Sequence, residues 1–225
     1  MRPYPVMMNL DNRQVIVVGG GRVALRKILG LLEGAAKVAV IAPEIILELA
    51  DLKRQGKIDW VEAPFDDLIL DQFTDAVLIF GTTNNRETNV EIYKSAKKRK
   101  IPCNIADVPD LCSFIVPAVI CQGDLIISVS TGGSSPALAR RIRQELEKQF
   151  GPEYGKMTKL MGDLRKQILN IGVASDENRK LFSEIVDSEI LSALRESDTK
   201  KVLNILKTIL PKDIDVDGAI TKDGS

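Results

Sequence analysis

Histidine is absent from this chain of 225 residues. That absence excludes Ser-His-Asp and Cys-His nucleophile pairs, zinc sites built on imidazole, and imidazole proton transfer. Long apolar runs are also missing, because none approaches the ~20 residues that a membrane-spanning helix needs. The three cysteines stand nine residues apart without a CxxC pair. This spacing predicts reduced thiols in the cytoplasm and no metal site. Chemistry here must rest on carboxylates, hydroxyls, backbone amides or a cofactor.

Charge of either sign is not in excess, since 31 Lys and Arg balance 31 Asp and Glu. A net charge of zero and a pI near 6.4 argue against a broad basic surface for phosphates. We therefore expect no nucleic-acid partner and no membrane partner. Hydrophobic residues make up 44% of the chain, which is enough for a real core. The length predicts one medium domain with an appendage.

The first half of the chain alternates β-branched runs with amphipathic stretches, the pattern of βα units around a parallel sheet. Strands are predicted at 14–18, 37–41, 57–61, 75–80 and 101–105. Helical patterns lie between them at 22–32, 44–54, 68–72 and 86–98. These elements predict an α/β fold with a Rossmann-like, doubly wound parallel sheet.

Four sections follow from this pattern. The dinucleotide-binding, Rossmann-like domain is predicted at 1–113, and a central segment follows at 114–150. Residues 151–210 carry only helical patterns and predict a small helical C-terminal domain. The polar tail at 211–225 is predicted to be flexible.

Local signals mark individual elements in the second half. Residues 125–130 alternate in a strand-like way. Ser135 is a suitable N-cap, and Pro136 suits the first position of the helix that follows. Asp176 and Asp198 each precede apolar-periodic segments and are predicted as N-caps.

The sharpest motif is a strand followed by Gly-x-Gly-x-x-Ala at the start of a helix. Gly19 permits the tight turn, Gly21 lets the backbone approach a pyrophosphate, and Ala24 lets helix and strand pack closely. The helix N-terminus then presents free N–H groups and a positive dipole end to phosphates. Dinucleotide binding is the favoured interpretation, and a tight turn without a ligand is the alternative.

Residues after the second and fourth strands reach the same edge of the sheet. The acidic residue that usually closes the second strand is displaced to Glu44, after Pro43. No Arg follows Ile41 closely to hold a 2′-phosphate, so NAD is favoured over NADP. A place in the first helical turn is the alternative for Glu44. Thr82 and Thr83 suit ribose or substrate, although loop-forming chemistry selects the same residues.

Asp107 follows the fifth predicted strand and therefore also reaches this edge. It is a candidate general acid/base, provided that partial desolvation raises its pKa. A turn or cap aspartate is the alternative.

A second glycine-rich turn, at 128–135, joins a strand to a helix. Its amides can form an anion-binding nest, and Arg140, Arg141 and Arg143 lie within two helical turns. A polycarboxylate ligand fits these donors, and a plain helix N-cap is the alternative.

These motifs together resemble the precorrin-2 dehydrogenase family, including the N-terminal region of multifunctional siroheme synthases. The resemblance covers about residues 1 to 210. The matching text is VVGGGRVALRK at 17–27, CNIAD at 103–107, SFIVPA at 113–118 and SVSTGGSSPALAR at 128–140.

The resemblance implies oxidation of precorrin-2 by NAD to sirohydrochlorin, a step in sirohaem biosynthesis, by a homodimer formed through 114–150. In some members the same protein also inserts ferrous iron. Implied NAD contacts are Gly19, Gly21, Arg22, Val23, Pro43, Glu44, Thr82 and Thr83. Implied substrate contacts are Asn104, Ser130, Thr131, Gly132, Gly133, Ser134 and Arg140, with Asp107 as the catalytic residue. Many members have Ser in place of Thr131, and the hydroxyl is retained here.

Two other functions stay open from the residues alone. An NAD-sensing regulatory module can use the first glycine turn without turnover, but it does not need the second glycine-rich loop. A dehydrogenase of another small substrate is the other alternative.

Overall fold

The computed structural model describes residues 3–171 and 175–221. It divides the chain into two compact units, Met1–Val116 and Pro117–Ser225. Residues 117–150 of the expected central segment and the helical section after it belong to the same second unit, whereas residues 114–116 belong to the first.

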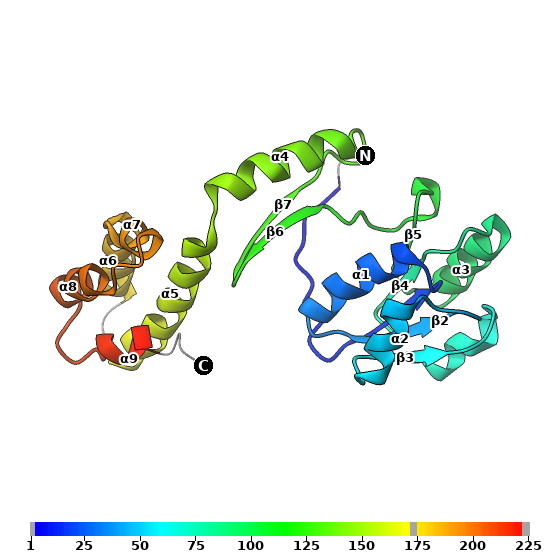
Figure 1. Cartoon of the computed structure of the whole chain (residues 1–225), viewed down its shortest axis with the longest axis horizontal. Helices are drawn as coiled ribbons and strands as arrows, with labels where there is room; N and C mark the ends of the chain where they lie inside the picture. Colours follow the sequence, from blue (N-terminus) through cyan, green and yellow to red (C-terminus); the bar gives the residue numbers. More distant parts are fainter. Residues whose placement is uncertain (1–2, 172–174, 222–225) are drawn as a thin grey trace. The chain divides into compact units, whose positions relative to one another are not determined.

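The first unit is built around a parallel sheet of five strands in the order β3-β2-β1-β4-β5. Figure 1 shows this sheet between helices α1 and α3. Its strands are β1 Gln14–Val18, β2 Lys37–Ile41, β3 Ile58–Val61, β4 Leu78–Gly81 and β5 Cys103–Ile105. The predicted Rossmann-like fold is confirmed, and the first two strands have the predicted bounds. Strands β1 and β2 are rich in Val and Ile, as is typical of strands in a sheet whose two faces are both covered.

Helices cover the two faces of this sheet. They are α1 Arg22–Glu33, α2 Leu47–Arg54 and α3 Arg86–Lys98, with short 3-10 helices η1 Asp67–Gln72 and η2 Pro109–Leu111. Ile28 of α1 and Leu49 of α2 pack on one face, while Leu70 of η1 and Ile92 of α3 pack on the other. The helix predicted at 44–54 begins only at Leu47, and the stretch predicted at 68–72 is a 3-10 helix.

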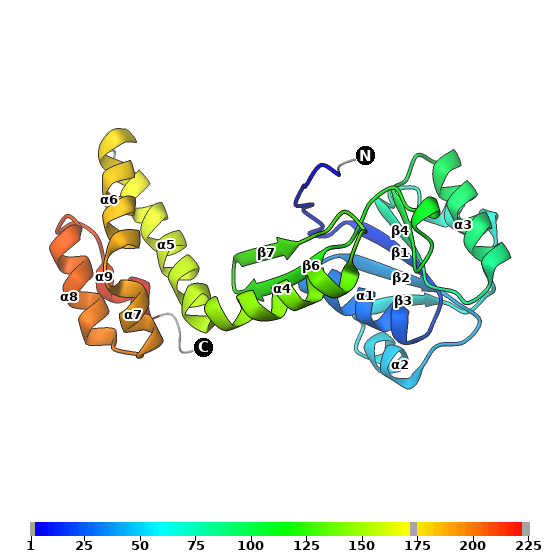
Figure 2. The ribbon, with the colours of Figure 1, turned by 90° about the horizontal axis from the view of Figure 1, so that it is seen from above.

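The second unit begins with a hairpin of β6 Ala118–Gln122 and β7 Leu125–Val129, which pair antiparallel. Helix α4, Pro136–Gln149, runs beside both strands (Figure 2). Ser135 is its N-cap as predicted, because its Oγ accepts a hydrogen bond of 3.3 Å from the Leu138 N–H. The sequence pattern predicted β7 but not β6.

The remaining helices form a bundle with its own core. They are α5 Pro152–Asn170, α6 Ser175–Asp187, α7 Ile190–Arg195, α8 Thr199–Ile209 and α9 Val216–Thr221. Fully buried Leu164, Ile185 and Leu206 meet at its centre. Asp198 caps α8 as predicted, whereas Asp176 lies inside the first turn of α6. Among the helices of the described ranges, none is long and apolar enough to cross a membrane.

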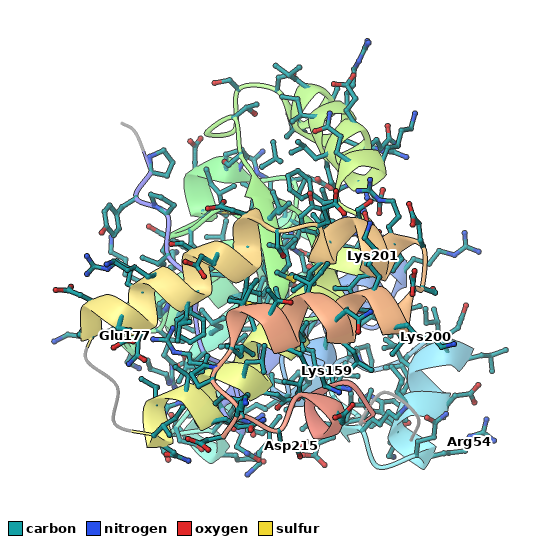
Figure 3. The ribbon with its side chains drawn as sticks, turned by 90° about the vertical axis from the view of Figure 1, so that its left-hand side faces the viewer. Arg54, Lys159, Glu177, Lys200, Lys201 and Asp215 are labelled. Carbon is teal, nitrogen blue, oxygen red and sulfur yellow. The ribbon has the colours of Figure 1, made fainter. Side chains whose placement is uncertain are left out.

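The prediction of a flexible tail at 211–225 is wrong for residues 211–221, which pack against the bundle. Ile214 and Val216 are buried in the core of the bundle. The Asp215 N–H donates to Gln167 Oε1 at 2.9 Å, and Gln167 Nε2 donates to the Asp215 carbonyl at 3.1 Å. Asp215 is labelled in Figure 3 beside this part of the bundle. The alternating aspartates give the sequence of this segment a polar character, but the intervening Ile214 and Val216 pack in the same core as residues of α5. Residues 222–225 lie outside the described residues.

One buried carboxylate stabilises the bundle. Glu153, in the first turn of α5, is 8% exposed and accepts hydrogen bonds of 3.0 and 2.8 Å from Nε and Nη2 of Arg195. These bonds hold the pKa of Glu153 below its ordinary value. We expect Glu153→Gln to lower the free energy of unfolding by about 1 to 3 kcal/mol at neutral pH, because a hydrogen-bonded charge is lost.

This loss has a defined pH dependence. A lowered native pKa stabilises the fold above the unfolded value of 4.5 and stops doing so as pH falls through the native value. The difference between Glu153→Gln and the unchanged chain is therefore expected to shrink below that range in thermal unfolding. Glu147→Gln, which removes an exposed partner of Arg143, is the control and is expected to cost less than about 1 kcal/mol. Equal unfolding temperatures for Glu153→Gln and the unchanged chain at neutral pH would contradict the prediction.

Candidate cofactor and substrate site

The first glycine turn follows β1, the strand at which the order of the strands in the sheet reverses. Strand β1 has β2 on one side and β4 on the other, and ligands of such sheets bind at the carboxyl ends of these strands. Gly19 has φ of +117°, which favours glycine, and a Cβ there would lie 2.5 Å from Thr82 Oγ1. The turn after β1 and the loop after β4 are therefore in close contact.

Gly20, which the sequence motif left without a role, holds the turn against the segment after β2. A Cβ at Gly20 would lie 2.0 Å from the carbonyl oxygen of Glu44. The Gly20 carbonyl in turn accepts a hydrogen bond of 2.9 Å from the Ile46 N–H. Glu44 thus lies beside the glycine turn. It precedes α2, which begins at Leu47, so the alternative of a first-turn helix residue is excluded.

Gly21 shows that the turn fits a dinucleotide. A Cβ there would meet no heavy atom within 4 Å, so the space next to its backbone is open. Gly21 is the N-cap of α1, and no side chain caps that helix end. Arg22 and Val23 follow in the first turn of α1. An open approach and an uncapped helix N-terminus are what a pyrophosphate needs.

The hydroxyls predicted at the end of β4 are engaged within the loop. Thr82 is 9% exposed, and both its N–H and its Oγ1 donate to the Val18 carbonyl at 2.8 Å. Thr83 Oγ1 donates to Asn89 Oδ1 at 2.8 Å. Thr82 and Thr83 therefore support the loop beside the glycine turn, which is the role that loop-forming chemistry assigned to them.

Asp107 stands in a turn directly after β5, at the carboxyl end of the sheet. Its φ is +60°, a left-handed conformation that Asp and Asn adopt more readily than most residues. The side chain is exposed, so the partial burial that the sequence interpretation required is not found in the first unit. The carboxylate is thus free to meet a ligand.

Asn104, a predicted substrate contact, is held at both ends of its side chain. It is 9% exposed, and its Nδ2 donates to the Phe114 carbonyl at 2.9 Å. Its Oδ1 accepts a hydrogen bond of 3.1 Å from Nζ of Lys27. Asn104 therefore fixes the strand end that precedes Asp107.

Lys27 is a residue of this edge that the sequence interpretation missed. It lies on α1, half-buried, with its ammonium 4.9 Å from the centroid of the Phe80 ring. Burial is the largest cause that lowers the pKa of Lys27. One feature of the sequence could have identified Lys27. It lies one helical turn from Ala24 and from Leu31, so the helical period places this lysine on the apolar face of α1.

Two thiols complete the packing around this strand end. Cys112 Sγ accepts a hydrogen bond from the Ile105 N–H at 3.3 Å and approaches Asn104 Nδ2 at 3.6 Å. Burial raises the pKa of Cys112 and raises that of Cys103 to about 12. Both thiols thus stay protonated and serve as packing groups rather than as nucleophiles.

The second glycine-rich turn lies in the second unit and is described by itself. Gly132 and Gly133 have φ of +63° and +89°. The Gly132 N–H donates to Ser130 Oγ at 3.2 Å, and Thr131 Oγ1 accepts from the Ser135 N–H at 2.9 Å. The Thr131 hydroxyl therefore closes the turn, a task that a serine hydroxyl performs equally. Gly132, Gly133 and Ser134 are exposed.

The arginines after this turn differ in their partners. Arg141 pairs with Glu145 at 3.0 Å, and Arg143 pairs with Glu147 at 2.8 Å, each one helical turn apart. Arg140 is exposed and forms no ion pair within the described part of the chain. Arg140 is thus the arginine with its charge available to a ligand.

Comparisons with known proteins agree with this geometry. Residues 6–118 match the family model described as putative NAD(P)-binding, and residues 122–149 match the model described as sirohaem biosynthesis protein central. "Siroheme synthase 3" of Aeromonas hydrophila is 32% identical over 222 residues, which is 98% of this chain and 47% of that protein. "Siroheme synthase" of Nitrosomonas europaea is 36% identical over 180 residues, covering 80% of this chain and 37% of that protein. The chain thus spans about half the length of the curated relatives it matches.

One solved structure is similar to this chain over nearly the whole length of both proteins. The structure of "SirC, precorrin-2 dehydrogenase" is similar with a TM-score of 0.73 and 26% sequence identity. The match covers 92% of this chain and 98% of that one. The resemblance to the precorrin-2 dehydrogenase family is confirmed, and the nicotinamide cofactor is established at the level of NAD(P). The chain therefore belongs to the putative NAD(P)-binding family and carries the sirohaem biosynthesis central region after it.

Proposed function

We propose that this chain oxidises precorrin-2 to sirohydrochlorin with NAD as the acceptor. The observation that carries the proposal is the similarity to the precorrin-2 dehydrogenase structure over nearly the whole of both chains. The glycine turn and Asp107 support it, because both lie at the carboxyl edge of one sheet. The reaction removes one hydride and one proton from the macrocycle.

NAD is the proposed form of the cofactor because of the residues that follow β2. The Glu44 backbone lies against the glycine turn. Its exposed side chain is the proposed partner of a ribose 2′-hydroxyl, and its negative charge would repel a 2′-phosphate. The segment 41–47 contains no Lys or Arg to bind such a phosphate.

Each residue group has a role in the proposed reaction. The bound nicotinamide supplies the hydride acceptor. The open backbone at Gly21 and the N–H groups of Arg22 and Val23 hold the pyrophosphate. Asp107 Oδ accepts the proton that leaves the substrate with the hydride. Ser130 to Ser134 and Arg140 bind carboxylates of the tetrapyrrole, through exposed amides and an available guanidinium.

The decisive experiment is an anaerobic absorbance assay with precorrin-2 and NAD. We expect stoichiometric formation of sirohydrochlorin and NADH, and slower formation when NADP replaces NAD. NAD binding without oxidation of precorrin-2 would favour the regulatory alternative. Oxidation of another substrate with no binding of sirohydrochlorin would favour a different dehydrogenase.

We also propose a homodimer formed through the hairpin and α4. Val119 and Ile126 are 37% and 49% exposed on the hairpin, and their strand partners place them on the same face. Leu138 of α4 is exposed as well. A second copy of this chain would cover these apolar side chains.

Placing a charge on this face tests the dimer. We expect Ile126→Asp to convert the protein to a monomer in light scattering at micromolar concentration, because a buried unpaired carboxylate costs several kcal/mol. Asn204→Asp, which adds the same charge at an exposed position of α8, is the control and is expected to stay dimeric. A monomeric unchanged chain under these conditions would reject the dimer.

A further inference from the structure

Lys27 carries a charge that its surroundings do not neutralise. Its ammonium donates to the neutral Asn104 amide at 3.1 Å and stands 4.9 Å from the Phe80 ring centroid. No carboxylate forms an ion pair with it among the residues that the structure describes. A half-buried cation without an anionic partner is costly, so a purely structural contact to Asn104 is a poor explanation for a lysine here.

The position of this ammonium points to the substrate rather than to the adenosine end of the cofactor. Phe80 belongs to β4 and Asn104 to β5, on the side of β1 opposite to β2 and Glu44. Asp107 follows Asn104 by three residues, and its negative charge acts to raise the pKa of Lys27. Lys27, through its hydrogen bond to Asn104, and the proposed proton acceptor are thus both attached to the end of β5.

The Lys27 ammonium keeps N–H groups with which it can donate hydrogen bonds to a ligand. An ammonium has three N–H groups, and the hydrogen bond to Asn104 uses one of them. Arg26 on the same helix lowers the pKa of Lys27, whereas Asp107 and the Cys112 thiol act in the opposite direction. The Cys112 thiol is itself protonated because burial raises its pKa.

We propose that Lys27 is a substrate-binding residue whose ammonium binds a carboxylate of the tetrapyrrole next to Asp107. The inference rests on the proposed function, since it assigns a further donor to the same substrate. Asn104 Oδ1 accepts a hydrogen bond from the ammonium and fixes it over the Phe80 ring. The substrate carboxylate supplies the negative charge that the protein does not.

Three variants separate this role from a structural one. Lys27→Met keeps the length and packing of the side chain but removes the charge, and Lys27→Arg keeps the charge. Arg26→Met is the matched control, because it removes a neighbouring exposed charge from the same helix. Each is measured by titration with sirohydrochlorin, by titration with NAD, and by the kinetics of precorrin-2 oxidation at several salt concentrations.

We expect Lys27→Met to weaken sirohydrochlorin binding and to raise KM for precorrin-2 by about ten- to a hundredfold, as loss of a charged hydrogen bond does. NAD affinity stays unchanged, and the unfolding temperature falls only as far as the loss of the one hydrogen bond to Asn104 requires. The dependence of sirohydrochlorin binding on salt becomes weaker. Lys27→Arg restores most of the affinity, and Arg26→Met behaves like the unchanged chain.

Two results would overturn the inference. One is sirohydrochlorin binding by Lys27→Met as tight as that of the unchanged chain. The other is an equal loss of NAD binding and thermal stability, which a structural role predicts. Failure of the unchanged chain itself to bind sirohydrochlorin or oxidise precorrin-2 would instead reject the proposed function.

Discussion

Gly20→Ala is expected to destabilise the first unit severely and to abolish NAD binding. The added Cβ would lie 2.0 Å from the Glu44 carbonyl oxygen and 2.9 Å from Ile45 Cα, and backbone atoms cannot move aside as a side-chain end can. Overpacking of this kind costs about 3 kcal/mol or more. Thermal unfolding and an NADH fluorescence titration measure the two effects.

Gly21→Ala is the matched partner of that variant. At Gly21 the φ of −97° is accessible to alanine, and an added Cβ meets nothing within 4 Å. Its unfolding temperature is therefore expected to stay within the effect of about 0.5 kcal/mol that ordinary surface substitutions have. NAD binding is nevertheless expected to be lost, because the methyl group occupies the approach of the pyrophosphate. Unimpaired NAD affinity in Gly21→Ala would show that the pyrophosphate does not lie at this turn.

Asp107→Asn is expected to slow precorrin-2 oxidation by about 10²- to 10⁴-fold, the usual contribution of a general base. The amide keeps the size of the side chain but cannot accept the proton. Asparagine also tolerates the φ of +60° at this position, so the turn and the stability should not change. The measurements are the anaerobic oxidation rate, the NAD affinity and the unfolding temperature.

Asp110→Asn provides the control for that prediction. Asp110 is an exposed aspartate three residues along the chain, in η2, and its replacement removes the same charge from the same region. We expect its oxidation rate to match that of the unchanged chain. An equal rate for Asp107→Asn would remove Asp107 from the catalytic step and leave it as a turn residue.

Residues adjacent in the chain were enough to predict the Rossmann-like sheet and the glycine turn. Strands of Val and Ile, helical stripes and the Gly-x-Gly-x-x-Ala spacing are local patterns with a direct physical meaning. The same reasoning failed at 211–221, where Ile214 and Val216 alternate with aspartates and only the contact with α5 shows that they are buried. Strand β6 was missed because its pairing with β7 is itself the stabilising interaction.

Contacts between distant residues decided what the individual side chains of the site do. Thr82 Oγ1 donates to the Val18 carbonyl across 64 positions of sequence, and Lys27 Nζ donates to Asn104 across 77. Gly20 matters because the Glu44 backbone passes beside it, and Asp107 is exposed because the turn after β5 projects it outward. Chemical identity and local conformation are properties of short segments and can be inferred from them. Burial, hydrogen-bond partners and an uncompensated charge depend on which segments the sheet brings together, and these only the folded arrangement determines.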